Sequence, residues 1–196
     1  MPDDAPQLKA VVEAAVGVRS ATAVWLLDAM SSVVAASGII YDALERGNKL
    51  VLFGNGGSAA QAQHIATELV GRFQRERAPL AAVALTADSA ILTAIANDYG
   101  YDEVFARQVR ALGQTGDVAM ALSTSGRSPN VLAGVAAARA VGMYVIALTG
   151  ELPNPLADAV DLVIPIPSGD TPLIQEAHLA IGHIICQAVD EVWSRA

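Results

Sequence analysis

The spacing of apolar residues changes near residue 47. Residues 8–46 contain no proline, and their apolar side chains recur every three to four positions, which is the period of a helix with one buried face. This stretch predicts an N-terminal helical arm over residues 1–47, made of two helices. From residue 48 onward, short continuous apolar runs alternate with segments of helical period, which predicts an α/β core over residues 48–196. We expect the arm and the core to form a single domain.

Five of the short apolar runs have the length and composition of buried strands: residues 50–53, 81–85, 118–122, 144–148 and 162–166. Helical segments separate or follow them at residues 59–73, 91–95, 129–141 and 172–193. Apolar strands that alternate with helices are typical of a parallel sheet covered on both faces. The predicted fold is therefore a three-layer α/β/α sandwich, flavodoxin-like, with a five-stranded parallel sheet. Ligands of such sheets bind beyond the carboxyl ends of the strands, so we expect the catalytic and binding residues in the loops that follow them.

Charge and composition narrow the function classes. The chain has 196 residues, with 20 acidic and 12 basic side chains and a net charge of -8, which is the wrong sign for a protein that binds a phosphate backbone. We therefore expect no nucleic-acid partner. Hydrophobic residues make up 53% of the chain and charged residues 16%, which leaves little polar surface for a monomer and predicts an oligomer.

The compartment is predicted from two features. One cysteine cannot form an internal disulfide, and the acidic N-terminus does not resemble a secretion signal, so we expect a cytoplasmic protein. The most apolar stretch, residues 21–41, is interrupted by Asp28 and by serines and a glycine. We interpret it as a buried helix rather than a membrane span, and we expect no membrane association.

The first predicted strand leads into the glycine-rich loop GNGGS at residues 54–58, and a helical segment follows. Glycines let a ligand approach backbone N–H groups, and the positive end of a helix dipole favours an anion such as a phosphate. The spacing from Gly54 to Ala59 also matches a dinucleotide fingerprint. That motif expects an acidic residue about 20 positions later, whereas Glu68 falls inside the helix and Asp88 lies 34 residues after Gly54. A tight turn without a ligand is a third interpretation.

The third predicted strand leads into the loop STSGRSP at residues 123–129. Ser128 is suited to be the N-cap of the next helix, with Pro129 at the first helical position. Hydroxyl groups and free helix N–H groups suit the phosphate of a sugar phosphate, and the net charge of -8 makes such local donors necessary. An ordinary serine-rich turn is the alternative. Both loops follow strands at the same edge of the sheet, which favours phosphate binding.

The histidines fall in two helical segments. His64 and Glu68 are four residues apart and lie on one face, as two ligands of a metal ion or a base and an acid do; a surface ion pair is the alternative. Gln175 and His183 share a broad face, because eight residues rotate by about 80°, and His178 points elsewhere. Eight residues also rise about 12 Å, so these two side chains meet at one ion only if they lean together or come from different subunits.

The ligand types permit a zinc site. Zn²⁺ held by His64, Glu68 and His183 would have ordinary nitrogen and oxygen ligands, and Gln175 would be an unusual neutral fourth ligand. Cys186 lies in an apolar segment one turn after His183, and we interpret it as a packing residue.

Taken together, these motifs resemble the phosphoheptose isomerases of the sugar isomerase (SIS) family, over essentially the whole chain. The residues that carry the resemblance are Gly54, Asn55, Gly56, Gly57, Ser58, His64, Glu68, Asn97, Asp98, Tyr99, Gly100, Ser123, Thr124, Ser125, Gly126, Gln175, Glu176, His178 and His183. The glycine and serine loops are shared by many SIS domains. Their combination with the histidines, Glu68 and Gln175 is more specific.

The resemblance implies an activity and a site. The activity is the conversion of sedoheptulose 7-phosphate to D-glycero-D-manno-heptose 7-phosphate through an enediolate, toward the heptose of lipopolysaccharide in the cell envelope. The implied substrate contacts are Asn55, Gly56, Gly57, Ser58, Glu68, Asn97, Asp98, Ser123, Thr124, Ser125, Ser128 and Gln175. One zinc ion per subunit would be held by His64, Glu68, Gln175 and His183. The resemblance also implies a homotetramer with sites at subunit interfaces.

Aldose–ketose isomerisation requires a base at carbon, an acid at oxygen and stabilisation of the negative charge that develops. The resemblance implies Glu68 as the base and His183 as the acid. A carboxylate bound to Zn²⁺ is a weaker base than a free one. Either Glu68 leaves the metal during turnover or the metal only organises the site.

Two observations qualify the resemblance. After Gly150 the family usually has a Gly-Gly loop, whereas this chain has Glu151-Leu152-Pro153-Asn154-Pro155, a stiffer segment that puts the substrate stereochemistry in question. The alternative function is that of a regulatory SIS protein, which binds a replication initiator or senses a sugar phosphate without catalysis. The presence of Glu68 in this chain favours the enzyme.

Overall fold

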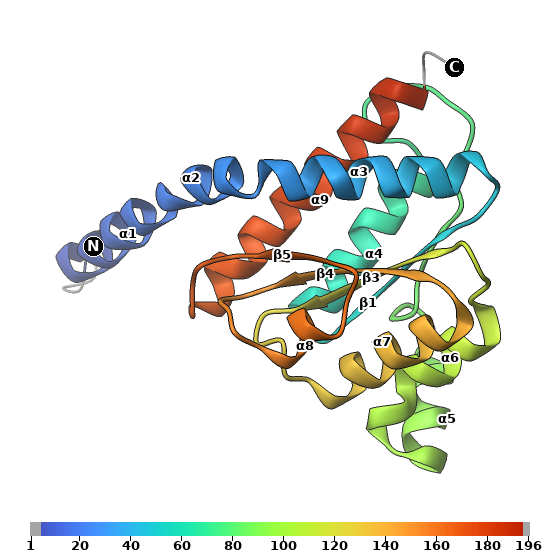
Figure 1. Cartoon of the computed structure of the whole chain (residues 1–196). Coiled ribbons are helices and arrows are strands. Elements are labelled where there is room, and N and C mark those ends of the chain that lie inside the picture. The colour runs from blue at the N-terminus through green and yellow to red at the C-terminus, as the bar shows by residue number, and fades with distance from the viewer. Residues whose placement is uncertain (1–4, 194–196) are drawn as a thin grey trace.

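The computed structural model describes residues 5–193 and has a five-stranded sheet at its centre (Figure 1). The strands are β1 (Leu50–Gly54), β2 (Ala82–Ala84), β3 (Val118–Ser123), β4 (Tyr144–Thr149) and β5 (Leu162–Pro165). Their order is β2-β1-β3-β4-β5, and each neighbouring pair is parallel. This is the flavodoxin-like order, and the predicted fold class is confirmed.

Two apolar cores lie on the two faces of the sheet, because successive strand residues point to opposite sides. In β1, Leu50 and Leu52 pack in the core beneath α3 (Met30–Glu45), α4 (Gly57–Val70) and α9 (Thr171–Trp193). Val51 and Phe53 pack in the opposite core, against α6 (Val104–Leu112) and α7 (Pro129–Val141). Figure 1 shows the sheet between these two helical layers. A central strand buried on both faces explains the continuous apolar run in the sequence.

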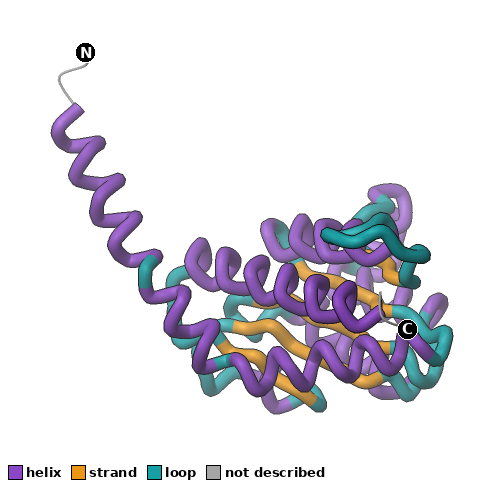
Figure 2. The backbone as a smooth tube through the Cα atoms, turned by 90° about the horizontal axis from the view of Figure 1, so that it is seen from above, coloured by secondary structure: helices purple, strands orange, loops and turns teal. Residues whose placement is uncertain are grey.

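The helical arm consists of three helices, where two were predicted: α1 (Ala5–Arg19), α2 (Ala21–Asp28) and α3. α1 projects away from the core, whereas α3 packs on α9 and buries Val33 and Ile40 (Figure 2). The prediction of a buried helix over residues 21–41 is wrong for α2, because Val24 and Leu27 are more than half exposed. The described chain has no element that covers this face of α2.

The exposed arm is apolar. The stretch Lys9–Asp28 is long and apolar enough to cross a membrane by length and composition, and it covers most of α1 and all of α2. Val11, Val12 and Val16 are all exposed there. Apolar helix faces that pack against another protein have the same composition, so this property alone does not identify a membrane span.

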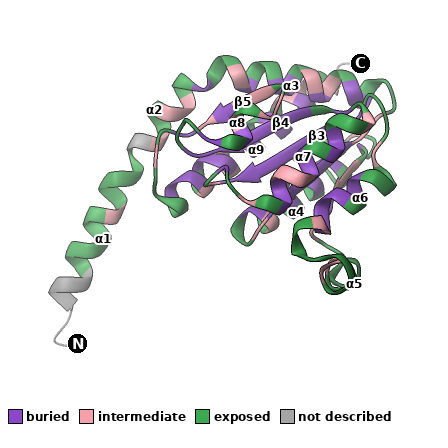
Figure 3. Ribbon diagram, turned by 60° about the horizontal axis from the view of Figure 1, so that its bottom comes forward, coloured by how far each residue is buried: buried purple, intermediate pink, exposed green. Residues whose placement is uncertain are grey.

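Two helices were not predicted. α5 (Ser89–Tyr99) ends at Gly100, which has a φ of +89°. The 3₁₀ turn η1 (Tyr101–Glu103) then leads into α6, the first of the two. Its buried Phe105 and Val109 alternate with exposed arginines, so the apolar signal is short. α8 (Pro155–Asp158) is a single turn capped by Asn154. α5 has no buried residue and protrudes from the core (Figure 3).

Candidate functional site

The candidate site lies where the sheet changes direction. The chain leaves β1 toward β2 and leaves β3 toward β4, in opposite directions across the sheet. In open α/β sheets, ligands bind at this switch point, beyond the carboxyl ends of the strands. The two loops predicted from the sequence, at residues 54–58 and 123–129, are the loops that leave β1 and β3.

The loop after β1 combines an exposed backbone with a fixed asparagine. Gly56 has a φ of +57°, which favours glycine, and it is the N-cap of α4. The carboxamides of Asn55 and Asn130 exchange two hydrogen bonds of 2.8 Å. The Tyr101 hydroxyl donates to Asn55 Oδ1 at 3.1 Å. Asn55 is therefore held from α7 and from η1, while Gly56 and Gly57 are exposed and Ser58 is buried.

The loop after β3 presents hydroxyl groups beside the first turn of α7. Ser128 is the N-cap of α7 and Pro129 begins the helix, as predicted, but the Ser128 hydroxyl does not cap the helix. That hydroxyl lies 3.5 Å from Ser123 Oγ, which also accepts from the Gly126 N–H group. Ser123 is buried, Thr124 and Ser128 are partly buried and Ser125 is exposed. The hydroxyls therefore range from the strand end to the surface.

A cavity of about 420 Å³ adjoins this loop. Thr124, Ser125, Arg127, Glu151, Leu152, Pro153, Asn154, Ser168, Gly169, Thr171 and Ile174 line it. Asn154 stiffens one rim, because its amide donates to Thr149 Oγ1 and to Glu151 O while its Oδ1 accepts from the Ala157 N–H group. The atypical segment after Gly150 thus forms one wall of the cavity next to the hydroxyl loop.

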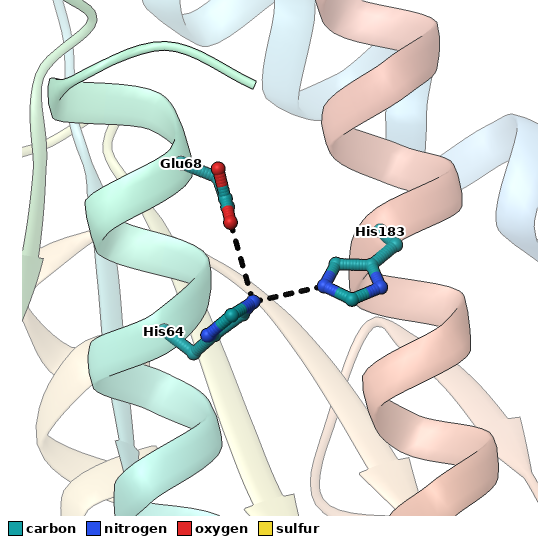
Figure 4. A group of neighbouring side chains, drawn as sticks. All are labelled: His64, Glu68 and His183. Atoms are coloured by element: carbon teal, nitrogen blue, oxygen red, sulfur yellow. Dashed lines mark hydrogen bonds and ion pairs between the residues drawn. The ribbon is translucent and has the colours of Figure 1, made fainter. Parts of the chain in front are cut away.

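The second half of the site lies on the seam between α4 and α9 (Figure 4). His64 Nε2 lies 2.9 Å from His183 Nε2 and 3.2 Å from Glu68 Oε1. His64 and Glu68 come from successive turns of α4, and His183 reaches them from α9. The side chain of His64 is 46% exposed and that of Glu68 is 20% exposed, so the group is open to a ligand.

The donor set fits a divalent metal ion. One ligand atom from each of His64, Glu68 and His183 lies within 4.8 Å of the others. Tetrahedral zinc with ligands at about 2.0–2.1 Å separates neighbouring ligand atoms by about 3.3 Å, close to the two distances around His64 Nε2. Two imidazole nitrogens and one carboxylate oxygen are the ligand types of catalytic zinc sites, which keep a position open for substrate.

Gln175 lies further along the same seam. Its backbone carbonyl accepts a 2.5 Å hydrogen bond from Gln61 Nε2, and its carboxamide packs against Gly57, where a Cβ atom would come within 2.6 Å of it. Gly57 is in the first turn of α4, and His64 follows two turns later. The structure therefore brings three of the four predicted metal ligands together, and it places the Gln175 amide next to the glycine loop.

Other residues singled out in the sequence lie in different environments. Asn97 and Asp98 are exposed in the last turn of α5, where Asn97 donates to Asp98. His178 is fully buried, its Nε2 donates to Thr149 O, and burial lowers its pKa to about 4. Burial and the charge of Glu68 raise the pKa of the Cys186 thiol to about 12, consistent with a packing residue.

Comparisons with known proteins identify the family of the chain. The family model of the SIS domain matches residues 19–150. The phosphoheptose isomerase of Aquifex aeolicus is 51% identical over 160 residues, covering 82% of this chain and 84% of that protein. The chain belongs to the phosphoheptose isomerase family. In Geobacter metallireducens, a relative of the same name is 54% identical over 159 residues, covering 81% of this chain and 84% of its own.

A solved structure extends the comparison to three dimensions. The phosphoheptose isomerase of Neisseria gonorrhoeae superposes with a TM-score of 0.84 at 40% identity, covering 92% of this chain and 99% of that one. Membership of this isomerase family agrees with the resemblance in the sequence motifs. Asn130 and Tyr101, which hold Asn55, were missed in the sequence, because neither belongs to a motif and both are distant along the chain.

Proposed function

We propose that the protein isomerises sedoheptulose 7-phosphate to D-glycero-D-manno-heptose 7-phosphate, a step toward the heptose of lipopolysaccharide. The observation that carries the proposal is the convergence of His64, Glu68 and His183 on one point in a chain of the phosphoheptose isomerase family. A carboxylate and an imidazole are the side chains that an aldose–ketose proton transfer requires. The hydroxyl loop after β3 supplies donors for a phosphate.

Proton transfer is assigned to Glu68 and His183. The carboxylate of Glu68 takes the proton from C1 of the ketose and returns it at C2. The imidazole of His183 donates a proton to O2 and then accepts the proton of the C1 hydroxyl as the aldehyde forms, so His183 is restored and no redox partner is required. One oxygen of Glu68 faces His64, and the other points away from both histidines (Figure 4). That second oxygen is suited to reach the C1 and C2 atoms of the substrate.

A zinc ion, one per subunit, is proposed to be held by His64, Glu68 and His183, with Gln175 as a fourth candidate ligand. When bound, the ion supplies positive charge for the developing enediolate oxygens. His64 is the hub of this cluster, because both short distances in the group end on its Nε2 atom. Its assigned task is to hold Glu68 and His183 in register.

The phosphate and the sugar chain are assigned to the loops. Ser123, Thr124, Ser125 and Ser128 would donate to the phosphate, together with the Asn130 N–H group in the first turn of α7. Asn55, Gly56, Gly57 and Ser58 would contact the sugar near its reacting end, and Asn97 and Asp98 are proposed contacts from α5. The exposure of Asn97 and Asp98 fits a role at the site of a neighbouring copy.

The assembly is proposed to be a homotetramer in the cytoplasm. Val11, Val16, Val24 and Leu27 are more than half exposed along the arm, which extends the apolar surface of α3 and α9. Burying such surface between copies removes it from water and stabilises association. Sites at subunit interfaces would then explain why some proposed contacts lie apart in a single chain.

Proton NMR with sedoheptulose 7-phosphate tests the proposed function. Appearance of the anomeric protons of an aldoheptose phosphate is the expected result. Fructose 6-phosphate is the control substrate, since it has the same ketose end and a shorter chain before the phosphate. Conversion of the hexose phosphate alone, or of neither sugar, would contradict the proposal.

A further inference from the structure

A segment of the chain behind the cluster touches both helices that carry it. Residues 71–80 leave the end of α4, cross toward α9 and then enter β2. Within this segment, Arg77 forms an ion pair with Asp190 of α9, with Nε 2.5 Å from Oδ1. Both side chains are only 2% exposed. We refer to residues 71–80 as the strap.

Arg77 binds the end of α4 with the rest of its guanidinium. Nη2 donates to the backbone carbonyl of Glu68 and Nη1 to that of Leu69, each at 2.8 Å. The last carbonyls of a helix have no partner within the helix, so Arg77 satisfies two of them. One of the two belongs to Glu68 itself. A planar fork with several donors can make all these bonds at once, and a lysine ammonium cannot reproduce that geometry.

Asp190 binds the strap from the other side. Its Oδ2 accepts the N–H groups of Gln74 and Arg75 at 2.9 and 3.0 Å. Burial acts to raise the pKa of Asp190, but these two N–H groups and the Arg77 guanidinium outweigh it and lower the pKa below its ordinary value. Asp190 therefore stays ionised and fully bonded. It lies seven residues, about two helical turns, after His183 on the same helix.

The strap also contacts the cluster directly. The ring of Phe73 lies 5.5 Å from the His183 imidazole, centroid to centroid, with the planes inclined by 31°. Phe73 packs on the apolar core beneath α4 and α9. The strap thus holds the backbone of Glu68 at one end and the ring of His183 at the other.

A buried ion pair needs an explanation other than stability, because the desolvation of two charges cancels much of their attraction. Well-packed apolar residues would hold two helices together at least as well. An ion pair with directional hydrogen bonds instead specifies one relative position of the helices. Metal sites require such specification, since ligand distances vary by only about 0.2 Å around a given ion.

We propose that Arg77 and Asp190 are positioning residues that set the spacing of α4 and α9, and with it the approach of Glu68 and His183 to the metal ion. The inference rests on the proposed function only for the metal site. It assigns no contact with substrate to either residue. Their effect is exerted through the backbone of Glu68 and through the helix that carries His183.

The chain offers a matched control at the opposite end of the sheet. Asp117 is also fully buried, accepts two backbone N–H groups, from Lys49 and Gln114, and pairs with a cation, Lys49 Nζ, at 2.6 Å. It precedes β3, at the amino end of the strand, whereas the cluster lies on the seam between α4 and α9. Asp117→Asn removes the same kind of charge from the same kind of network without touching that seam.

Zinc affinity is the readout, measured by competition of the metal-free proteins with a chromophoric chelator at a temperature where circular dichroism shows all of them folded. We expect Asp190→Asn and Arg77→Lys to lose about tenfold or more in affinity, the range found for partners that orient metal ligands. Asp117→Asn should stay within about twofold of the wild type. At saturating zinc, the first two variants should lose kcat with little change in KM, since the phosphate loop is untouched.

The outcomes separate the two proposals. Equal zinc affinity in Asp190→Asn and Asp117→Asn would overturn the positioning role and reduce the pair to a structural contact. If Asp190→Asn does not fold, Arg77→Lys, which keeps the charge opposite Asp190, gives the same test. A wild type that binds zinc without isomerising the sugar would overturn the proposed function and leave the affinity comparison valid. A wild type that binds no zinc would overturn the positioning role.

Discussion

The α4–α9 seam and the loop after β3 hold the two halves of the proposed site in different ways. On the seam, His64, Glu68 and His183 project from long helices that are joined by the strap. At the loop, Ser123 is the buried last residue of β3, whereas Ser125 lies in the short connection to α7 and is exposed. Proton transfer needs a few atoms in fixed positions, whereas a phosphate can be held by several interchangeable donors. The fold supplies rigidity to the first half and a surplus of donors to the second.

The largest effect should come from the seam. Glu68→Gln removes the proposed base and keeps the size of the side chain, so kcat should fall by about a thousandfold, within the range for loss of a general base. Steady-state kinetics measures the loss of kcat, and a thermal melt checks that the variant is folded. Glu45→Gln, at the end of α3, is the control and should leave kcat unchanged. A Glu68→Gln variant that keeps most of its activity would remove the base assignment.

The second effect concerns His178, which is buried and donates to the carbonyl of Thr149 at the end of β4. Its pKa is lowered by burial to about 4, from 6.5 in the unfolded chain, so between these values only the unfolded state takes up a proton. The free energy of unfolding should therefore fall by about 3 kcal/mol as the pH drops from 6.5 to 4.

Urea unfolding at several pH values measures this slope, and His178→Gln should flatten it between pH 6.5 and 4. Asp117 and Asp190 have pKa values that are lowered from their ordinary value near 3.8, so their stabilisation is lost only at lower pH. An equal slope in the wild type and the variant would show that His178 does not couple folding to pH.

The hydroxyl loop should show a smaller and different effect. Replacing Ser123 and Ser125 by alanine removes two proposed donors to the phosphate, each worth about 1–2 kcal/mol. KM should rise by about tenfold or more while kcat changes little, because a remote phosphate is held similarly in the ground and transition states. Ser89→Ala, at the start of α5, is a control for loss of an exposed hydroxyl. A loss confined to kcat would place these serines at the reacting carbons.

The smallest effect should come from the support of the glycine loop. Tyr101→Phe removes the hydroxyl that donates to Asn55, while the paired hydrogen bonds from Asn130 remain. A single neutral hydrogen bond contributes about 1 kcal/mol, so KM should rise by about two- to fivefold. Asn130→Ala should have the greater effect in the same assay, since it removes two bonds. The reverse order would mean that Tyr101 contacts the substrate itself.

Much of the fold could be predicted because local patterns determine it. Buried strands such as β1 and β3 are continuous apolar runs, and the helices between them dictate a parallel sheet. α6 was missed because it is only nine residues long and follows α5 after a single 3₁₀ turn, although most of its residues are apolar. The exposure of α2 was missed because an apolar sequence does not say whether the same chain or another copy covers it.

From the sequence, only those parts of the site that lie on a single helix could be predicted. The spacing of His64 and Glu68 places both on one face of α4, which any helix would do. Their meeting with His183 joins residues 119 positions apart, and it depends on how α4 packs on α9. Arg77 and Asp190 are 113 positions apart, and no local sequence pattern predicts that they pair. The comparisons establish the family, and the geometry supplies the hypotheses about individual residues.

A zinc titration of the metal-free wild type with sedoheptulose 7-phosphate tests the central claim most directly. The account predicts no product without metal and a rate that rises with added zinc until about one ion is bound per subunit, as expected of a single catalytic site. His64→Ala should abolish this dependence, because it removes the hub of the cluster. Full turnover in the chelated protein would contradict the account, and so would the absence of an aldoheptose phosphate at every zinc concentration.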